Sequence, residues 1–380
     1  MKAIINGRIV TPESVVEGKV LVYDEKIQGI VETAPAGAEV IDAQGGYVIP
    51  GLVDMHIHGY LGEDASDGSY EGLKIMAEGV AKNGVTSFLP TTMTVSYDEL
   101  RKAFSLIRKG MEESRSADWK GAAIVGANAE GPFINISKKG AQAGEHVRVG
   151  DPAFLKEFID VIRVFTIAPE VEGNMDCIRE MAKDTDVLIS MGHTAANFDQ
   201  ARAAIEAGVR HVTHLFNAQT GLLHRDPGVV GAALLDSRVS TELIADTFHI
   251  HKGLFQLVAN VKGDKLVLIT DCTRAGGLED GEYTLGGQPI FVKGIECRLA
   301  DGTIAGSVLK LNEAVRNVLA NTDLPVNEVV NMASLTPATR IGLGDTKGSL
   351  EAGKDADIAI VDEAFNVQRT ILAGRTIYEK

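Results

Sequence analysis

The sequence predicts an α/β protein, a (β/α)8 TIM-type barrel with a small β-sandwich domain formed by both termini. Three observations support this fold class. Eight apolar, strand-like runs follow one another through the middle of the chain, and amphipathic helical segments separate most of them. Parallel strands require such crossover helices, and eight is the number of strands that closes a barrel. Both ends of the chain lack a helical period and consist of short β-type runs between turns.

Short β-type runs fill the first 50 residues. They are Ala3–Ile5, Arg8–Val10, Lys19–Tyr23, Ile27–Val31 and Val40–Asp42. Asn6-Gly7, between the first two runs, is a strong signal for a tight hairpin. The C-terminal end has similar runs at Ala356–Val361 and Arg369–Ala373. We therefore expect a small β-sandwich domain made of residues 1–50 plus 345–380, and a barrel domain made of residues 51–344.

The barrel strands are expected at eight apolar runs. They are Leu52–His58, Val85–Met93, Ala122–Glu130, Val161–Ala168, Val187–His193, His211–Asn217, Thr241–His249 and Lys265–Asp271. Ser96 with Glu99, and Asn197 with Gln200, have the spacing of capping boxes that begin amphipathic helices, and Gly208 is suited to end the second helix. An open doubly wound sheet is the alternative. No Gly-x-Gly-x-x-Gly follows a strand, which removes the most common cofactor signature of that fold.

Residues 279–305 follow the eighth run and are expected to form a β-hairpin insertion. A helix should begin after it, near Ser307. Because the insertion comes directly after Asp271, at the end of a barrel strand, it could form a flap beside a site at that end of the barrel.

Composition restricts the classes of function. The 380 residues are 45% hydrophobic, which allows a substantial core, and the formal net charge of −15 argues against a general nucleic-acid or anionic-membrane surface. The three cysteines have no metal-like spacing and indicate a reducing compartment. The N-terminus has the pattern of a strand rather than a signal peptide, and no apolar run reaches the length of a membrane span. We therefore expect a cytoplasmic protein.

The first strand ends in a histidine pair, His56 and His58, followed by Gly59. Side chains at positions i and i+2 of a strand face the same way, so the two imidazoles should project together. Two imidazoles on one face can bind a metal ion. Two buried histidines satisfied by hydrogen bonds are the alternative, which does not explain why similar residues recur at later strand ends.

Polar residues recur where the later strands end. Barrel enzymes place their chemistry at this C-terminal rim. The candidates there are Glu130, His193, His214, Asn217, Asp246, His249 and Asp271. Each has an ordinary structural explanation by itself, such as a helix cap or a turn. Together the histidines and carboxylates predict a mononuclear or binuclear site for a divalent metal such as Zn, Fe, Mn or Co.

Two nearby residues are expected to lie away from the site. His211 is three residues before His214, so strand alternation points it to the opposite face. Cys272 follows Asp271 and should face the core.

The motifs of the chain resemble those of the amidohydrolase superfamily, and within it the family of N-acetylglucosamine-6-phosphate deacetylases. The His56-x-His58 motif is shared across the superfamily. The more specific motifs are Glu130-Gly131-Pro132-Phe133, Gly192-His193-Thr194, His214-Leu215-Phe216-Asn217-Ala218, Thr270-Asp271 and Gly281-Glu282-Tyr283-x-Leu285-Gly286-Gly287. They occur in the order of the family and span the chain.

The resemblance implies a role for each ligand candidate. Glu130, His193 and His214 match the main metal site, and His56 and His58 match a second site that only some members keep, with Glu130 bridging the two. Asp271 matches the catalytic carboxylate. The fourth strand carries no lysine, so a dihydroorotase-like or urease-like centre with a carboxylated lysine is disfavoured.

The implied reaction is hydrolysis of the acetamide of N-acetyl-D-glucosamine 6-phosphate to D-glucosamine 6-phosphate and acetate, in amino-sugar catabolism and recycling. A bound metal lowers the pKa of its water towards about 7, and the resulting hydroxide attacks the acetyl carbonyl. Asp271 acts as general base and then as general acid, work that contributes about 10²–10⁴-fold.

Substrate recognition is expected to rest on a second set of residues, which are Gln142, Asn217, Ala218, Arg225 and His249. In the family, the arginine that matches Arg225 reaches the neighbouring subunit's site, which implies a homodimer. An exposed Arg225 paired with Asp226 is the alternative. Gln142 stands where many members have a histidine that contacts the acetyl carbonyl. Its amide can donate a hydrogen bond but cannot become cationic.

Two further departures lie near the expected sugar site. Gln219 replaces a usual methionine, and Thr247 lies where glycine is common. With Gln142, these departures make N-acetylgalactosamine-6-phosphate the nearest alternative substrate. The same barrel could also serve a different metal-dependent amide hydrolase, or a non-catalytic protein that uses it for protein contacts. The phosphate-binding set disfavours the first of these functions, and the complete set of metal ligands disfavours the second.

Overall fold

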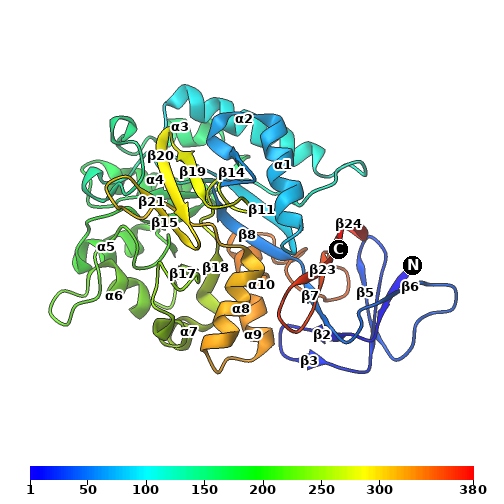
Figure 1. Ribbon diagram of the computed structural model, residues 1–380. Helices are drawn as coiled ribbons and strands as arrows, with labels where there is room; N and C mark the ends of the chain where they lie inside the picture. Colours follow the sequence, from blue (N-terminus) through cyan, green and yellow to red (C-terminus); the bar gives the residue numbers. More distant parts are fainter.

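The computed structural model describes residues 1–380, with a barrel ringed by helices and a smaller β region beside it (Figure 1). Eight parallel strand positions form the barrel, which confirms the predicted fold. The strands are β8 (Leu52–Ile57), β11 (Val85–Thr92), β12 (Ala123–Ile124) with β13 (Ala127–Ala129), β14 (Ile162–Ile167), β15 (Leu188–Met191), β16 (His211–Val212), β17 (Ser240–Ile244) and β18 (Leu266–Ile269). Each pairs in parallel with the next.

The barrel closes where β18 meets β8. The backbone N–H of Asp271 donates to the carbonyl oxygen of His56 at 2.9 Å, and that of His58 donates to Cys272 at 2.9 Å. A buried side-chain bond from the Thr270 hydroxyl to Asp54 (2.6 Å) reinforces the seam. The first and last barrel strands are thus tied together next to the residues that were predicted to bind metal.

Helices surround the barrel. They are α1 (Tyr70–Ala81), α2 (Tyr97–Glu113), α3 (Pro152–Glu157), α4 (Asn174–Asp184), α5 (Phe198–Ala207), α6 (Gly228–Leu235), α7 (Phe255–Lys262), α8 (Leu311–Asn321), α9 (Val326–Met332) and α10 (Leu335–Arg340). Both predicted capping boxes are present, at the starts of α2 and α5. The helix expected near Ser307 begins later, because the Ser307 hydroxyl instead donates to the Thr270 carbonyl (2.6 Å) and holds the chain against the barrel rim.

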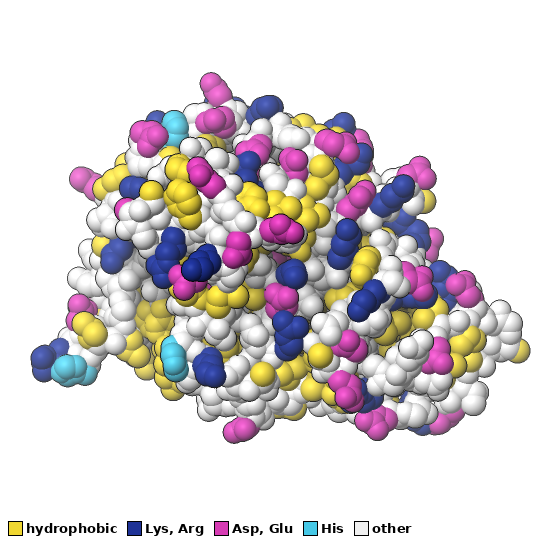
Figure 2. All heavy atoms as spheres, in the orientation of Figure 1, with side chains coloured by type: hydrophobic (Ala, Val, Ile, Leu, Met, Phe, Trp, Pro, Cys, Tyr) yellow, Lys and Arg dark blue, Asp and Glu magenta, His cyan; other side chains and the backbone are white.

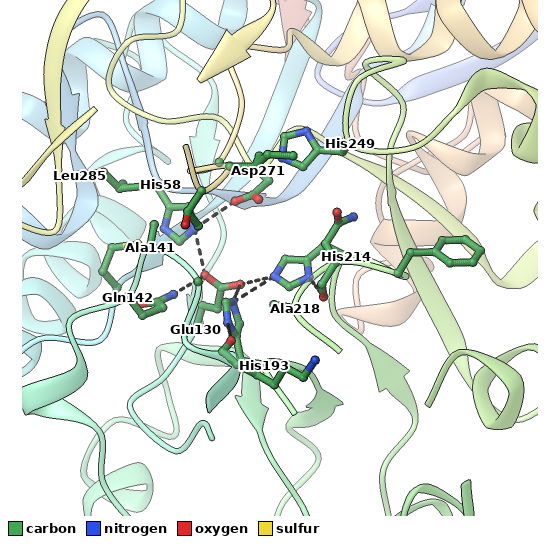
Figure 3. Close-up of a pocket in the computed structure, with 18 of the residues that line it drawn as sticks. His58, Glu130, Ala141, Gln142, His193, His214, Ala218, His249, Asp271 and Leu285 are labelled. Atoms are coloured by element: carbon green, nitrogen blue, oxygen red, sulfur yellow. Dashed lines mark hydrogen bonds and ion pairs between the residues drawn. The ribbon is translucent and has the colours of Figure 1, made fainter. Parts of the chain in front are cut away.

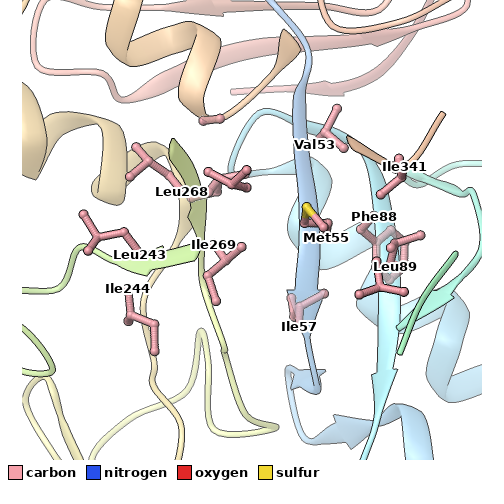
Figure 4. Packing of buried hydrophobic residues seen from close by; sticks show 14 of the residues in the cluster. Val53, Met55, Ile57, Phe88, Leu89, Leu243, Ile244, Leu268, Ile269 and Ile341 are labelled. Atoms are coloured by element: carbon pink, nitrogen blue, oxygen red, sulfur yellow. The ribbon is translucent and has the colours of Figure 1, made fainter. Parts of the chain in front are cut away.

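Alternation along β8 divides its side chains between two environments. Val53, Met55 and Ile57 belong to a core of 76 buried residues and lie in line next to β11 (Figure 4). Asp54 and His56 occupy the intervening positions and make polar contacts inside the barrel. A strand buried on both faces is typical of a parallel barrel. This register is what presents the histidine pair at one end of the barrel.

The two ends of the chain build two further sheets. The order of the first sheet is β5 (Ile27–Val31), β4 (Val20–Tyr23), β1 (Lys2–Ile5), β6 (Glu39–Asp42). The order of the second is β24 (Arg375–Glu379), β23 (Val367–Leu372), β22 (Ile358–Val361), β7 (Tyr47–Pro50), β2 (Arg8–Val10), β3 (Val15–Val16). A cluster of 13 buried apolar residues, drawn from both sheets, lies between them. The predicted terminal β-sandwich is therefore confirmed.

The predicted hairpin at Asn6-Gly7 is wrong. β1 and β2 flank this dipeptide but belong to different sheets. Asn6 does adopt a positive φ of 54°, as a tight turn requires, but Gly7 packs so closely on Val48 that a Cβ there would lie 2.5 Å from its side chain. The turn therefore carries the chain across the sandwich instead of folding it back on itself.

The insertion after the eighth strand is a three-stranded antiparallel sheet, not the predicted hairpin. Its strands are β19 (Gly281–Leu285), β20 (Gln288–Lys293) and β21 (Glu296–Leu299). Leu285, Ile290 and Cys297 pack in a separate small core with Met93 and Ala141 from barrel loops. The third strand lets the sheet bury one face against these loops, which a two-stranded ribbon does poorly.

The remaining elements are short. They are β9 (Gly59–Tyr60), β10 (Glu63–Asp64) and the 3₁₀ turns η1 (Ala65–Asp67), η2 (Ile136–Lys138), η3 (Gly144–His146), η4 (Lys252–Leu254) and η5 (Gly263–Lys265). No helix is long and apolar enough to cross a membrane. Acidic and basic side chains are interspersed on the face of the molecule in Figure 2, without a large field of one sign.

Candidate metal centre and substrate pocket

The barrel rim brings the predicted metal ligands into one buried cluster. His56 and His58 come from the end of β8, and the others follow β13, β15 and β16. Glu130 lies at the centre of the cluster (Figure 3). Its Oε1 atom is 2.8 Å from His214 Nε2 and 3.2 Å from His193 Nε2, and its Oε2 atom is 3.1 Å from His58 Nε2.

The donor atoms fall into two groups that share Glu130. His56, His58 and Glu130 form one group, and Glu130, His193 and His214 form the other. Within each group the donor atoms lie within 4.8 Å of one another. All five side chains are buried. Nitrogen and carboxylate oxygen donors of this kind suit Zn, Fe, Mn or Co.

Each histidine is oriented by a hydrogen bond from its Nδ1 atom. His58, His193 and His214 donate to the backbone carbonyl oxygens of Thr91 (3.1 Å), Lys138 (2.8 Å) and Asn217 (3.1 Å), respectively. Carbonyl oxygens accept only, so the proton of a neutral ring must lie on Nδ1. The Nε2 lone pair of each ring then faces the centre.

The arrangement fits a cation. Lone pairs of the Nε2 atoms and of the Glu130 carboxylate converge on one another, and the Gln142 amide, which donates to Glu130 Oε2 at 2.8 Å, satisfies only part of this demand. Without a metal, protons meet this demand. Burial alone lowers the pKa of His58, but hydrogen bonds to Asp271 and Glu130 raise it to about 10. Burial alone raises the pKa of Glu130, but His56 and His193 hold it well below its usual range.

Asp271 lies at the edge of the cluster and faces the cavity. Its Oδ1 atom is 3.1 Å from His58 Nε2 and 3.4 Å from His56 Nε2. Burial raises the pKa of this carboxyl, but the hydrogen bond from His58 and the charge of His56 outweigh burial and lower it. The side chain is therefore ionised at neutral pH and can accept a proton from a group in the cavity.

Strained backbone concentrates at this rim. Eleven non-glycine residues of the chain have positive φ, and six of them lie here. They are His193 (45°), His214 (27°), Phe216 (80°), Ala218 (51°), Thr247 (68°) and Asp271 (50°). Such conformations cost about 1–3 kcal/mol each and cluster at functional sites. Three of the six are predicted ligands or the predicted catalytic carboxylate.

A cavity of about 410 Å³ opens beside the cluster. Four of the five predicted substrate residues line it, namely Gln142, Asn217, Ala218 and His249. Leu285 of the three-stranded sheet and Ile304, just after that sheet, cover part of the cavity. The insertion is therefore a wall of the pocket. The Nδ1 atom of His249 donates to Asp246 Oδ2 at 2.6 Å, which fixes the ring.

Arg225 does not line the cavity of its own chain. Residues 221–226 are all exposed, and their loop projects from the body of the molecule beside α6 (Figure 1). Arg225 and Asp226 are both exposed and form no ion pair with each other, so the pair expected as the alternative does not form.

The three departures from the family pattern have distinct structural roles. The Gln142 side chain accepts a hydrogen bond from the backbone N–H of Thr94 (2.6 Å) and donates to Glu130 Oε2 (2.8 Å). Its amide is thus engaged with the cluster rather than directed at an acetyl group. Gln219 Nε2 lies within 3.2–3.3 Å of three backbone carbonyl oxygens of the loop that carries His214, those of Thr213, His214 and Asn217. Thr247 has a positive φ of 68° and lies two residues before His249.

The prediction for His211 is wrong. The ring lies inside the barrel, with Nε2 3.1 Å from Glu242 Oε1. β16 contains only His211 and Val212, so alternation cannot be extended to His214, which lies beyond the strand with a φ of 27°. The prediction for Cys272 agrees with the structure, where the residue is fully buried in the main core.

Glu242 is the main polar residue that the sequence reasoning missed. It is fully buried in β17, and its Oε2 atom is 2.9 Å from His56 Nδ1. Burial raises the pKa of Glu242, but the charges of His56 and His211 outweigh burial and lower it. A glutamate inside the apolar run Thr241–Ile244 was the available signal, because a buried carboxylate requires partners.

Comparison with known proteins agrees with this geometry. Residues 47–377 match the family model described as the amidohydrolase family. An N-acetylglucosamine-6-phosphate deacetylase of Bacillus subtilis is 38% identical over 381 residues, which cover 97% of this chain and 95% of that one. An N-acetylgalactosamine-6-phosphate deacetylase of Escherichia coli O157:H7 is 36% identical, with 97% of each chain covered.

Solved structures give the same result. The N-acetylglucosamine-6-phosphate deacetylase of Pasteurella multocida superposes with a TM-score of 0.93 at 33% identity and covers 99% of both chains. The chain therefore belongs to the amidohydrolase family. It is a hydrolase, and within the family it groups with the N-acetylglucosamine-6-phosphate deacetylases just described.

Proposed function

We propose that this enzyme hydrolyses the acetamide of N-acetyl-D-glucosamine 6-phosphate to D-glucosamine 6-phosphate and acetate, in amino-sugar catabolism and recycling. The observation that carries the proposal is the pair of donor groups that share Glu130, with Asp271 at the edge of the same cavity. The cavity volume of about 410 Å³ lies within the range of small-molecule sites. Relatives that match nearly the whole chain carry this activity in their names.

The metal requirement follows from the donor set. Glu130, His193 and His214 would hold one divalent ion, and His56 and His58 would hold a second ion with Glu130 between them. A bound ion supplies a Lewis acid, which polarises the acetyl carbonyl and makes water acidic. The protein contributes the orientation of each ring through its Nδ1 hydrogen bond.

Asp271 would move the proton. Hydrolysis forms a bond between the water oxygen and the acetyl carbon and breaks the carbon–nitrogen bond. The ionised Asp271 carboxylate takes a proton from the water and delivers it to the nitrogen that leaves as the amine. Its position beside His58, at the cavity edge, supports this role.

The sugar phosphate would lie towards Asn217, Ala218 and His249. Ala218 lines the cavity, and its backbone N–H donates to no protein acceptor, so we propose that this group binds an anion. Arg225 would complete the phosphate site of a neighbouring subunit in a homodimer, since its exposed loop projects from the molecule. An arginine suits phosphate because its planar group donates two parallel hydrogen bonds.

The division into residues 1–50 plus 345–380 and residues 51–344 is part of the same proposal, with catalysis assigned to the barrel. The pairing of β7 with β22 supports a common domain for both termini. We also propose that the protein is cytoplasmic.

The galacto epimer is the second candidate substrate. The Escherichia coli relative with that name is almost as similar as the Bacillus subtilis one, at 36% against 38% identity. Gln142 lines the cavity and Thr247 lies two residues before His249, which also lines it. Both differ from the family pattern, and we propose that they influence the epimer preference.

The test is acetate release from N-acetylglucosamine 6-phosphate, its galacto epimer and unphosphorylated N-acetylglucosamine, with metal analysis of the same sample. Release from the gluco phosphate alone supports the proposal. A preference for the galacto phosphate supports the second candidate. Equal release from the unphosphorylated sugar contradicts the proposed phosphate site. No release from metal-loaded enzyme contradicts both candidates and leaves another amide as substrate.

A further inference from the structure

One ligand histidine is oriented differently from the other three. His58, His193 and His214 are fixed by backbone carbonyl oxygens, whereas His56 donates from Nδ1 to the side chain of Glu242 at 2.9 Å. Both side chains have no exposed surface. The orientation of His56 therefore depends on the identity of a residue on another strand, and a single substitution can change it.

Glu242 is satisfied by three donors. Besides His56, its Oε2 atom accepts the backbone N–H of His214 at 2.9 Å, and its Oε1 atom lies 3.1 Å from His211 Nε2. The other ring nitrogen of His211, Nδ1, forms a hydrogen bond of 2.6 Å with Ser240 Oγ. A carboxylate without solvent is costly to bury unless it is paired and hydrogen-bonded. This carboxylate is fully paired, and two of its three partners are residues of the metal cluster.

We propose that Glu242 is a positioning residue that sets the metal affinity of the two-histidine group, His56 and His58, by holding the His56 ring with Nε2 towards Glu130. The proposal deepens the proposed function and rests on its assignment of a second metal ion to this group. A carboxylate behind a ligand histidine fixes the ring and makes it a better electron donor to a metal.

Glu242 also connects the two donor groups. The same Oε2 atom that holds His56 holds the backbone of His214, which has a φ of 27° and belongs to the other group. Loss of the carboxylate should therefore weaken the second site strongly and the first site less, because His214 keeps its own Nδ1 bond to Asn217.

A purely structural role is the competing explanation. In that case removal of the charge would change the stability of the barrel but not the ratio of metal ions bound. Metal stoichiometry therefore distinguishes the two explanations, since it does not depend on turnover.

The experiment uses the full chain loaded with Zn²⁺ or Co²⁺. Wild type and Glu242→Gln are dialysed, their metal content is measured by mass spectrometry, and each site is titrated with a chelator. We expect wild type to hold two equivalents and Glu242→Gln to hold one tightly, with the second bound about 10–100-fold more weakly. The visible spectrum of the Co²⁺ form should lose the contribution of the second ion.

The matched control is Asp357→Asn. Asp357 is a buried carboxylate paired with Lys347, and its backbone carbonyl accepts from Gly51, at the opposite end of β8 from the histidine pair. It should lower stability without changing metal content. His56→Ala provides a second comparison. If Glu242 acts through His56, adding Glu242→Gln to His56→Ala should weaken the second site no further.

His211→Gln keeps the proposal testable if Glu242→Gln does not fold. This change disturbs the hydrogen bond between His211 Nε2 and Glu242 Oε1, so the carboxylate is held less firmly. The metal affinity of the second site should therefore fall by a smaller factor than in Glu242→Gln. Two tightly bound equivalents in a folded Glu242→Gln or His211→Gln protein overturn the role of Glu242. A single equivalent in wild type overturns the two-site assignment and this inference with it. Two equivalents in wild type without acetate release contradict only the proposed substrate.

Discussion

The barrel rim that carries the histidine cluster and the sandwich formed by the termini both have buried interiors, but the rim buries polar side chains and the sandwich buries apolar ones. The sandwich interior holds 13 apolar residues, among them Ile4, Leu21 and Ile358. The rim buries four histidines together with the carboxylates of Glu130, Glu242 and Asp271. Apolar burial stabilises a fold directly, whereas buried charges cost free energy unless every one is paired.

The difference indicates that the sandwich mainly stabilises the fold, whereas the rim positions the polar side chains of the candidate site. Regular, apolar packing in the sandwich and the barrel wall stabilises the chain and offsets the unfavourable rim. The rim in turn contains residues in strained conformations whose side chains converge on one point. Changes in the sandwich should therefore alter the free energy of unfolding but not metal content or turnover. Changes at the rim should alter metal content or turnover but leave the packing of the sandwich intact. The predictions below test that separation, beginning with the largest expected effect.

Asp271→Asn should reduce turnover by about 10²–10⁴-fold, because the amide cannot accept and transfer the proton. Metal content and thermal stability should stay near wild type, since asparagine has nearly the same shape as aspartate and the five side chains of the two donor groups are unchanged. Steady-state acetate release and metal analysis on the same sample provide the measurement. Activity near wild type would remove Asp271 from the proton-transfer role.

Ile358→Ala should show the reverse pattern. Ile358 is fully buried in the sandwich cluster, so truncation should lower the free energy of unfolding by about 2–5 kcal/mol. Turnover and metal content of the folded protein should not change. Denaturant unfolding gives the measurement, and Val40→Ala is the control, since Val40 is an apolar sandwich residue that is 51% exposed. A loss of metal in Ile358→Ala would show that the two regions are not separable.

Arg225→Ala should raise KM for the phosphorylated sugar by about 10–100-fold, the size of a lost charge-assisted hydrogen bond. Neither stability nor metal content should respond, because the side chain is exposed and outside both cores. Arg179→Ala, a change at an exposed arginine on α4, is the control. An equal rise in KM for an unphosphorylated substrate would argue against phosphate contact.

The smallest effect is expected for labelling of the three buried cysteines by a thiol reagent, which should proceed slowly in the native protein. Burial raises the pKa of the Cys297 thiol to about 11 and that of Cys177 to about 12, so both are protonated and unreactive at pH 8. Native protein should label slowly, with Cys297 first, because it lies in the small core of the three-stranded sheet rather than in the barrel. Mass spectrometry of timed samples gives the order. Immediate labelling of all three cysteines would contradict the burial argument.

The fold and the clustering of the histidine and glutamate side chains could be predicted from the sequence for one physical reason. Parallel strands all end at one face, so polar residues at strand ends must meet there wherever the intervening helices lie. Glu130, His193 and His214 could thus be brought together without knowledge of the packing. The two capping boxes are local signals and were equally accessible.

The errors arose where pairing or orientation depends on distant residues. Asn6-Gly7 has local turn chemistry, but nothing local states that the next strand pairs with β7 instead of β1. Strand alternation predicts the wrong face for His211, because β16 contains only two residues and ends before His214. The role of Glu242 depends on which side chains face it across the barrel, and that requires the register of β16 and β17.

The pairing of β7 with β22 has a consequence for the order of assembly. The whole barrel is synthesised between these two strands, so β7 emerges from the ribosome long before its partner. Barrel neighbours are consecutive in sequence and can pair as they appear, whereas the sandwich depends on a contact between the two ends of the chain. The second sheet of the sandwich is therefore completed last, whereas the first sheet, whose strands all lie within residues 2–42, does not wait for the C-terminus. A nascent chain that stops before Ile358 leaves β7 as an open sheet edge, available for pairing with other chains.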